Sequence, residues 1–528
     1  MTRQGVSTLP MLLSIDRHAR DGALYRQLYR ALRAEILEGR LVPGARLPGS
    51  RVLANDLGLS RATILAAYDE LAAEGYIVGR RGGGTRVAAG IPRIRPASAL
   101  EDYDGDTIVS PPVDVSLLGA RMIADHGDPS PRAPVNRAIP FVLGVPALDD
   151  FPIAIWMRLT ARRWRETPRA MLASDDGPGY APLRQAIAEY VVTARAVRCT
   201  QDQVVITAGG QQGIDLIARL LVNPGDAVWL EEYGYPPARA IFAGVGAHGV
   251  GVPVDEEGLD VAGAMRLAAS ARVALVTPAC AAPLGVTMSL RRRLALLEWA
   301  HRNRAWIIED DYNGEFRYEG KPLSALQGLE HPGARRVIYL RTFSRTLFPA
   351  LRLGYAVLPR ELVEMFTRAR FVADRHSPTA EQAVLADFIV GGHFARHVRN
   401  MRSLYAARQR VLLDLASAAL GDRLRIHAAP AGMSVLGRLP PGICDRMVAV
   451  EAARRGVIVE PLSLRAMNPS DQRGLFLGYT PFGAAETRRA LAQLALAIQV
   501  VAEGHSLPSA PPIGMSTSSE ASRRRRRD

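Results

Sequence analysis

The chain has 528 residues, 48% of them hydrophobic, and a net charge of +14. This length exceeds one ordinary core, so two or more domains are expected, and the basic excess favours a polyanionic partner. The sequence contains no apolar run of 18 residues and no signal peptide, and its three cysteines have neither disulfide-framework nor metal-ligand spacing. We therefore expect a cytoplasmic protein with no membrane partner and no metal site.

Three helical patterns occupy the first 90 residues, which carry 13 Arg against 8 Asp plus Glu. Apolar residues between positions 24 and 37 recur at helical spacing. A second, short helix begins at Ser50 and stops at Gly58. Ser60 can cap a third helix, which ends at Gly75. Two helices separated by a tight glycine turn predict a helix-turn-helix.

A hairpin of residues 76–78 and 85–87 follows, joined by glycine-rich residues that include Arg80 and Arg81. Such a hairpin supplies the wing of a winged helix. We expect Arg61 and Thr63, near the start of the third helix, to meet base edges in the major groove. The wing arginines would reach phosphates or the minor groove.

Residues 20–88 as a whole resemble the GntR-type winged helix DNA-binding domain. The motifs that carry this resemblance are Leu47-Pro48-Gly49-Ser50-Arg51-Val52-Leu53-Ala54, Leu59-Ser60-Arg61-Ala62-Thr63, Ala67-Tyr68-Asp69-Glu70-Leu71, Gly75-Tyr76-Ile77 and Gly82-Gly83-Gly84-Thr85. Gly49 is a small departure, since serine is more usual there. The resemblance implies that double-stranded DNA is the partner. The implied DNA contacts are Arg51, Ser60, Arg61, Thr63, Arg80 and Arg81.

Two further segments lack a sustained hydrophobic period. Residues 89–139 are rich in Pro, Asp, Ser and Gly and predict a linker without structure of its own. Residues 503–528 end in the run Arg523–Arg527 and predict a disordered basic tail. Non-specific help in DNA binding is the alternative role for that run.

Between these segments, residues 140–502 alternate short apolar runs with amphipathic stretches, which predicts an α/β domain with a largely parallel sheet. The expected strands are Val204-Val205-Ile206-Thr207, Val228-Trp229-Leu230, Val273-Ala274-Leu275-Val276, Trp306-Ile307-Ile308 and Val337-Ile338-Tyr339-Leu340. In such sheets ligands lie beyond the carboxyl ends of the strands.

The residues that follow these strands suit a phosphorylated pyridine. Gly210 and Gln211 open a helix whose free N–H groups can hold an anion. Asp310 could pair with a protonated pyridine nitrogen, and Tyr312 could reach a ring oxygen. An arginine such as Arg352 suits a phosphate bidentately. A simple tight turn or surface position is the alternative reading for each one singly.

Residues 140–502 resemble the α/β fold type I aminotransferase domain of the pyridoxal-phosphate (PLP)-dependent transferases, and with the winged helix the chain resembles a MocR-type regulator. The motifs are Gly179-Tyr180-Ala181-Pro182-Leu183-Arg184, Ile206-Thr207-Ala208-Gly209-Gly210-Gln211-Gln212, Pro283-Leu284-Gly285-Val286-Thr287-Met288, Ile308-Glu309-Asp310-Asp311-Tyr312, Glu315-Phe316-Arg317-Tyr318 and Leu347-Phe348-Pro349-Ala350-Leu351-Arg352-Leu353-Gly354-Tyr355.

This resemblance implies a homodimer and a set of cofactor contacts. Gly210, Gln211, Ser344 and Arg352 would hold the phosphate of PLP, Asp310 the pyridine nitrogen and Tyr312 the ring hydroxyl. Arg473 is a weaker candidate for a ligand carboxylate.

The same pocket departs from the aminotransferase pattern at the position of the Schiff-base lysine. Arg345 stands there, and the chain's single lysine, Lys321, aligns well away from it. A guanidinium stays charged in proteins and cannot act as the amine nucleophile. Three more departures are Cys280-Ala281-Ala282 in place of a polar and aromatic trio, Ser174 in place of a partner tyrosine, and Arg341 in place of a glycine.

We therefore expect a DNA-binding transcription regulator whose degenerate aminotransferase-like domain has no catalytic residue and serves for dimerisation and for sensing a small anionic or amino-compound effector. PLP would bind only non-covalently or be lost altogether; a regulator that holds the cofactor or an adduct in this way is one alternative. An active aminotransferase is another. A sharper expectation is that Arg345 pairs with Asp310 and closes the pocket; the competing expectation is that Arg345 binds a phosphate or carboxylate of a ligand.

Overall fold

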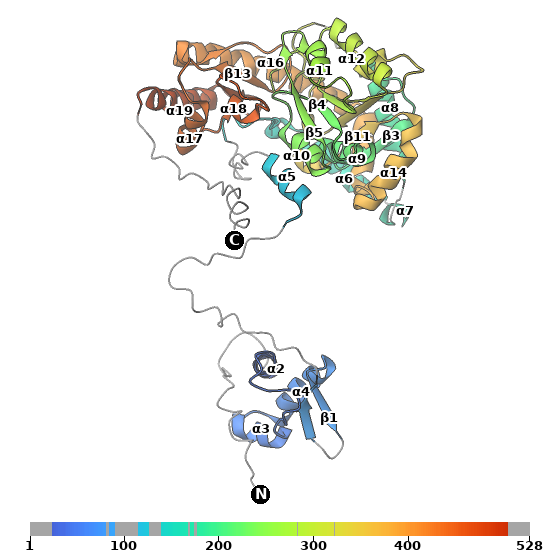
Figure 1. Cartoon of the computed structure of the whole chain (residues 1–528), viewed down its shortest axis with the longest axis vertical. Helices are drawn as coiled ribbons and strands as arrows, with labels where there is room; N and C mark the ends of the chain where they lie inside the picture. The colour runs from blue at the N-terminus through green and yellow to red at the C-terminus, as the bar shows by residue number, and fades with distance from the viewer. Residues whose placement is uncertain are drawn as a thin grey trace, which may run out of the picture. The chain divides into compact units, whose positions relative to one another are not determined.

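The computed structural model describes residues 24–80, 84–89, 115–125, 139–166, 169–173, 177–281, 283–320 and 323–504. The chain divides into two compact units, Met1–Val113 and Asp114–Asp528. Figure 1 shows the first unit in blue and the second from cyan to red. The Arg523–Arg527 tail lies outside the described residues.

The first unit is a three-helix domain with a hairpin. Its elements are α2 (Leu24–Leu37), α3 (Ser50–Leu57), α4 (Arg61–Ala73), β1 (Ile77–Arg80) and β2 (Gly84–Val87). Leu28 and Leu32 of α2 pack with Ile64 and Leu71 of α4 in a single core. The apolar period of the sequence thus forms the faces that hold the helices together.

Local capping fixes the turn between α3 and α4. Gly58 ends α3 in the left-handed region at φ 59°, and Ser60 then caps α4 by accepting the Thr63 N–H at 3.1 Å. The antiparallel hairpin pairs Ile77 with Val87 and Arg80 with Gly84. These features confirm the expected winged helix-turn-helix.

A seven-stranded sheet forms the centre of the second unit, in the order β3-β11-β10-β9-β8-β4-β5. β11 is antiparallel to both of its neighbours, and the remaining pairs are parallel. The strands are β3 (Val204–Thr207), β4 (Ala227–Glu231), β5 (His248–Val252), β8 (Val273–Val276), β9 (Trp306–Asp310), β10 (Val337–Thr342) and β11 (Gly354–Val357). All five strands expected from the sequence belong to this sheet.

Helices cover both faces of the sheet (Figure 1) because successive strand residues point to opposite sides. Val204 and Ile206 pack in the cluster under α6, α8 and α15, whereas Val205 packs under α9, α10 and α14. The helices and the small hairpin of this part are α6 (Ile153–Arg165), α7 (Arg169–Leu172), α8 (Ala181–Arg195), α9 (Gly210–Leu221), α10 (Pro236–Gly244), α11 (Val261–Ala268), α12 (Leu290–Asn303), α13 (Leu326–Leu329), α14 (Arg360–Asp374), α15 (Thr379–Val390), β6 (Val254–Asp255) and β7 (Gly258–Leu259).

A smaller antiparallel sheet follows the long helix α16 (His393–Leu420). Its strands, in spatial order, are β12 (Arg425–Ile426), β13 (Ser434–Arg438), β15 (Gly474–Gly478) and β14 (Glu460–Pro461), and α17 (Asp445–Arg454), α18 (Leu462–Arg465) and α19 (Ala484–Ala502) accompany them. Leucines of β15 and α19 share one core with α16. No helix of the described residues is both long and apolar enough to cross a membrane.

Two stretches before α6 also belong to this unit. Residues 117–125, inside the expected linker, form helix α5 (Leu117–Asp125), so the expectation of no structure is wrong there. α5 packs against α10, where a Cβ added to Gly244 would lie 3.3 Å from Met122 Sδ. Residues 139–147 run along the small sheet, where the Gly478 N–H donates to the Phe141 carbonyl at 2.9 Å.

Candidate functional site

The start of α4 presents a polar face. Arg51, Ser60 and Arg61 are exposed, and Thr63 is half-buried. Arg61 Nε donates to Ser50 Oγ at 3.3 Å, which links the first turns of α3 and α4. The four residues expected in the recognition face therefore lie on the two helices of one helix-turn-helix.

The wing adds further arginines. Arg80 ends β1, and Arg81 lies outside the described residues. The structure also places the exposed Arg46 at the wing, since a Cβ on Gly84 would lie 3.0 Å from Arg46 Nε. The sequence reading did not select Arg46, because it lies in the turn before α3 and its pairing with Arg86 is a long-range contact.

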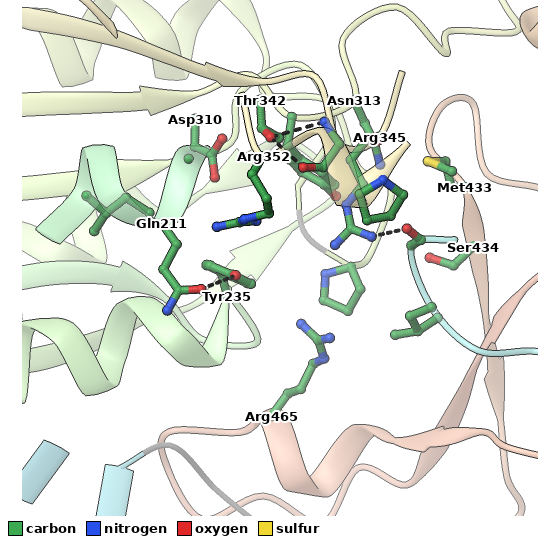
Figure 2. Close-up of a pocket in the computed structure, with 18 residues that line it drawn as sticks. Gln211, Tyr235, Asp310, Asn313, Thr342, Arg345, Arg352, Met433, Ser434 and Arg465 are labelled. Carbon is green, nitrogen blue, oxygen red and sulfur yellow. Dashed lines mark hydrogen bonds between the residues drawn. The ribbon is translucent and has the colours of Figure 1, made fainter. Parts of the chain in front are cut away.

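A pocket of about 280 Å³ lies between the carboxyl edge of the seven-stranded sheet and the small sheet (Figure 2). The six residues expected to hold a cofactor all line it: Gly210, Gln211, Asp310, Tyr312, Ser344 and Arg352. They come from α9, from β9 and the loop after it, and from the loops on either side of η4 (Pro349–Leu351). The sheet topology thus gathers residues that are up to 142 positions apart in the sequence.

One end of the pocket is suited to an anion. Gly209 precedes α9 at φ 104°, a conformation that favours glycine, and its Cα lies beside the Arg352 guanidinium. Within the described residues, Arg352 makes no side-chain hydrogen bond or ion pair, so its donors are available. Gln211 accepts from the Tyr235 hydroxyl at 3.4 Å, and the Ser344 hydroxyl bonds Thr342 Oγ1 at 3.0 Å.

Asp310 supplies the acid of the pocket. Burial, followed by the charges of Asp311 and Glu231, raises the pKa of Asp310 to about 7, although Arg345 and Arg341 oppose this. Its carboxylate has no hydrogen-bond or ion-pair partner in the described part of the chain. Tyr312 lines the same wall, and burial, with Cys280 nearby, holds the pKa of Tyr312 well above its ordinary value.

Arg345 does not pair with Asp310. Its Nη1 donates to the backbone carbonyl of Gly144, and no ion pair joins it to Asp310 (Figure 2). The expected internal pair that closes the pocket is therefore wrong. The physical reason is that a carbonyl from residues 139–147 offers Arg345 an acceptor, so its charge reaches Asp310 only at a distance.

A second arginine expectation also differs from the structure. Arg473 does not line the pocket; its Nη1 donates to the carbonyls of Ser470 and Gln472. Arg465 of α18 lines the pocket instead, with its guanidinium paired to Glu460 and donating to the Gly234 carbonyl at 3.2 Å. No local motif marks Arg465, so only the fold reveals it.

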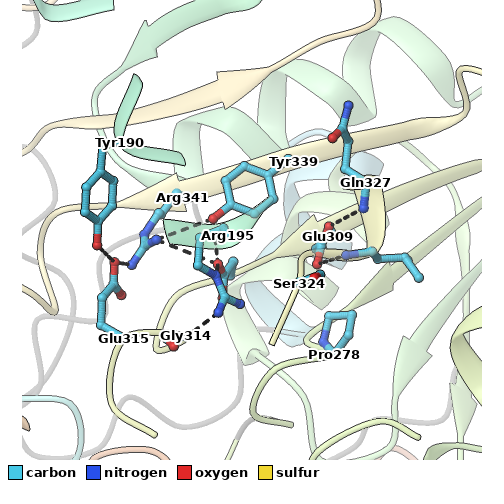
Figure 3. Close-up of polar contacts among 12 residues, drawn as sticks. Tyr190, Arg195, Pro278, Glu309, Gly314, Glu315, Ser324, Gln327, Tyr339 and Arg341 are labelled. Carbon is cyan, nitrogen blue, oxygen red and sulfur yellow. Dashed lines mark hydrogen bonds and ion pairs between the residues drawn. The ribbon is translucent and has the colours of Figure 1, made fainter. Parts of the chain in front are cut away.

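Arg341, the other arginine departure, lies in a buried network and not in the pocket (Figure 3). It is 2% exposed, forms an ion pair with Glu315 and lies 3.7 Å from Asp311. Arg195 pairs with Asp311 at 2.8 Å, and the Tyr339 hydroxyl donates to it at 2.6 Å. Burial disfavours the Asp311 charge, but these partners outweigh it and hold the pKa of Asp311 below its ordinary value.

The three residues before Pro283, which the resemblance predicts to depart from the aminotransferase pattern, have small side chains. Cys280 and Ala281 are buried, and Ala282 lies outside the described residues. Ser174 and Lys321 also lie outside them. No group of three or more metal-ligating side chains occurs in the residues described.

Comparison with known proteins defines the class. Residues 24–87 match the family of bacterial regulatory proteins of the GntR type, and residues 142–473 match aminotransferase class I and II. The solved structure of alpha-aminoadipate aminotransferase LysN from Thermus thermophilus resembles the aminotransferase-like part of this chain. The TM-score is 0.66, and the two sequences are 25% identical over 74% of this chain and 98% of that chain. A kynurenine aminotransferase of Pyrococcus horikoshii gives a TM-score of 0.64 at 25% identity over 76% and 98%.

Full-length relatives share both parts. The probable rhizopine catabolism regulatory protein MocR of Rhizobium meliloti is 38% identical over 94% of this chain and 98% of its own length. The pyridoxine biosynthesis regulator PdxR of Corynebacterium glutamicum is 30% identical over 90% and 96%. The chain belongs to the MocR-type transcriptional regulators, in which a GntR winged helix precedes an aminotransferase-like domain.

Proposed function

We propose that the protein is a DNA-binding transcription regulator whose aminotransferase-like domain senses a small anionic ligand and does not transaminate. What supports this proposal is that Arg345, which the family resemblance aligns with the nucleophilic lysine, lines one pocket with the residues expected to hold the phosphate and the pyridine. The relatives MocR, TauR and PdxR are named as regulators, which supports a role in transcription regulation.

DNA recognition is assigned to the winged helix. Ser60, Arg61 and Thr63 at the start of the recognition helix α4 would contact the major groove, together with Arg51 from the first turn of α3, which the Arg61–Ser50 hydrogen bond links to α4. Arg80 and Arg81 of the wing, with Arg46 beside it, would contact the backbone or minor groove. Its partner being chromosomal DNA, the protein would work in the cytoplasm.

The residues of the pocket fit PLP or pyridoxamine phosphate held without a covalent bond. Arg352, Ser344 and the first turn of α9, with Gly210 and Gln211, would hold the phosphate. Asp310, whose carboxylate has no partner among the described residues, would accept a hydrogen bond from the protonated pyridine nitrogen, and Tyr312 would contact the ring hydroxyl. When bound in an enzyme, this cofactor supplies an electron sink for carbanions.

Transamination needs an amine at position 345 as general base for the proton shift, as well as an anchor. An arginine guanidinium does not serve as a general base in proteins, so Arg345 would not take up that proton. We therefore assign the domain a sensing and dimerising role. The homodimer is inferred from the family's fold and would present two DNA-reading heads to repeated half-sites.

The test is a gel-shift titration of the full chain on DNA from its own gene neighbourhood. Binding should weaken steeply as salt rises, because phosphate contacts release counterions. Arg61→Ala should abolish the specific shift, whereas Arg30→Ala, an exposed arginine of α2, should leave sequence preference unchanged. Equal loss of specificity in both variants would show that the recognition helix is misassigned.

A further inference from the structure

Residues 139–147 are held to the small sheet by hydrogen bonds that come from distant parts of the chain. The Ile458 N–H donates to the Pro140 carbonyl at 3.2 Å, and the Gly478 N–H to the Phe141 carbonyl at 2.9 Å. The Ala147 N–H donates to the Tyr405 hydroxyl at 3.0 Å. Leu143 and Gly144 of this segment also line the pocket.

Arg345 adds a contact in the middle of that segment. Its Nη1 donates to the Gly144 carbonyl, across 201 positions of sequence. Gly144 has φ 68°, and a Cβ at this position would overlap the Arg345 guanidinium. The backbone conformation therefore favours glycine at this position, and any larger side chain would have to displace the guanidinium from the Gly144 carbonyl.

The same guanidinium lines the pocket beside Arg352 (Figure 2). Its acceptor is a neutral carbonyl, and within the described residues it has no carboxylate partner. The Gly144 carbonyl carries no net charge, whereas an anion adds Coulomb attraction to its hydrogen bond with the guanidinium. A ligand anion that reaches Arg345 would therefore compete with Gly144 for it.

We propose that Arg345 is a ligand-responsive latch. Without ligand, Arg345 holds the Gly144 turn of residues 139–147 in place. A ligand with two anionic groups would bind Arg352 through one group and Arg345 through the other. The second contact draws the guanidinium away from Gly144 and loosens residues 139–147. The arginine thus determines ligand specificity and couples pocket occupancy to the order of residues 139–147. The displacement step rests on the proposed ligand pocket; the hold on Gly144 does not.

Hydrogen–deuterium exchange of the full-length protein tests whether the Arg345–Gly144 hydrogen bond stabilises residues 139–147. The reporters are the amides of Ala147, Ile458 and Gly478. Arg345→Met keeps the side-chain length but removes the donors, and it should speed exchange at these amides roughly tenfold or more, leaving β10 amides unchanged. Arg368→Ala, an exposed arginine on α14, should match the unaltered protein. Equal reporter exchange in the unaltered protein and Arg345→Met would overturn the latch.

Two matched probes test the displacement. N-(5′-phosphopyridoxyl)-L-alanine carries a phosphate and a carboxylate, whereas pyridoxamine phosphate lacks the carboxylate. Only the first should speed exchange at the three reporters, and only when position 345 is arginine. Calorimetric binding of the first probe without any change in exchange would refute displacement. Failure of both probes to bind would refute the proposed ligand pocket and the displacement step. The comparison with Arg345→Met would still decide whether Arg345 stabilises residues 139–147.

Discussion

At the scale of single residues, the pocket separates binding from chemistry. Arg352 suits the phosphate and Asp310 the ring nitrogen of a phosphorylated pyridine. Neither side chain has a hydrogen-bond or ion-pair partner among the residues described. Arg345 adds a permanent cation where a titratable amine would be required. On the function we propose, the pocket holds an anion but lacks the group that would move a proton on it.

Arg352 should dominate the affinity for a phosphate. Arg352→Ala should weaken pyridoxamine phosphate binding by roughly ten- to a hundredfold, because a charge-assisted, bidentate contact is lost. Isothermal titration calorimetry measures this. Arg473→Ala is the matched control and should bind as the unaltered protein does, since Arg473 does not line the pocket. Equal losses in both variants would contradict the assignment.

Asp310 should make stability depend on pH. Its folded pKa of about 7 lies above the ordinary 3.8, so folding takes up a proton between these values and stability falls as pH rises through that window. Asp310→Asn removes the charge. Its gain in unfolding free energy should be small at pH 4 and reach at most about 4 kcal/mol above pH 7. Chemical denaturation at both pH values measures the gain, and a gain independent of pH would contradict it.

At the scale of elements, β10 is held to its surroundings by ions as well as by apolar packing. Arg341 of β10 and Glu315 are both buried, and they form an ion pair next to the Arg195–Asp311 pair (Figure 3). Removing one partner of such a pair leaves a buried charge without compensation, which costs more than the pair contributes.

Arg341→Met should therefore destabilise the large domain by about 3–5 kcal/mol, because Glu315 keeps its charge in a buried site. Denaturant midpoints with far-UV circular dichroism measure this. The double variant Arg341→Met with Glu315→Gln should recover part of the loss, since no charge remains unpaired there. A double variant no more stable than the single one would show that the buried charge is not the cause.

Much of this fold could be predicted because the strands are short, apolar and bounded by polar turns. Val273–Val276, for example, is buried throughout and needs no partner to be recognised. The strand order could not be predicted, since β11 lies between β3 and β10 only through long-range pairing. Helix α5 was missed because its stability comes from Met122 against α10, which local periodicity does not show.

The candidate site shows the same division. Residues at strand ends, such as Asp310 and Ser344, were expected to meet because parallel strands end at one edge, and they line one pocket. The direction of Arg345 could not be predicted, since its acceptor is the carbonyl of Gly144, 201 residues away in sequence. The same holds for Arg465, which enters the pocket from the small sheet's side.

At the scale of the whole molecule, the chain joins a GntR winged helix to a domain with the aminotransferase fold. Each part has its own core and its own candidate site. If ligand and DNA binding are coupled, thermodynamic linkage requires that each changes the affinity of the other by the same factor. A sensor needs this coupling and a ligand pocket, but no turnover.

The visible absorption spectrum of the full-length protein with added PLP tests the central claim most directly, measured beside Arg345→Lys. The unaltered protein should show only the spectrum of the free or non-covalently held cofactor and no transamination of an added amino acid. Arg345→Lys should show a new absorption band from covalent attachment, because the remaining contacts of the pocket are in place. A covalent band or turnover in the unaltered protein would contradict the account.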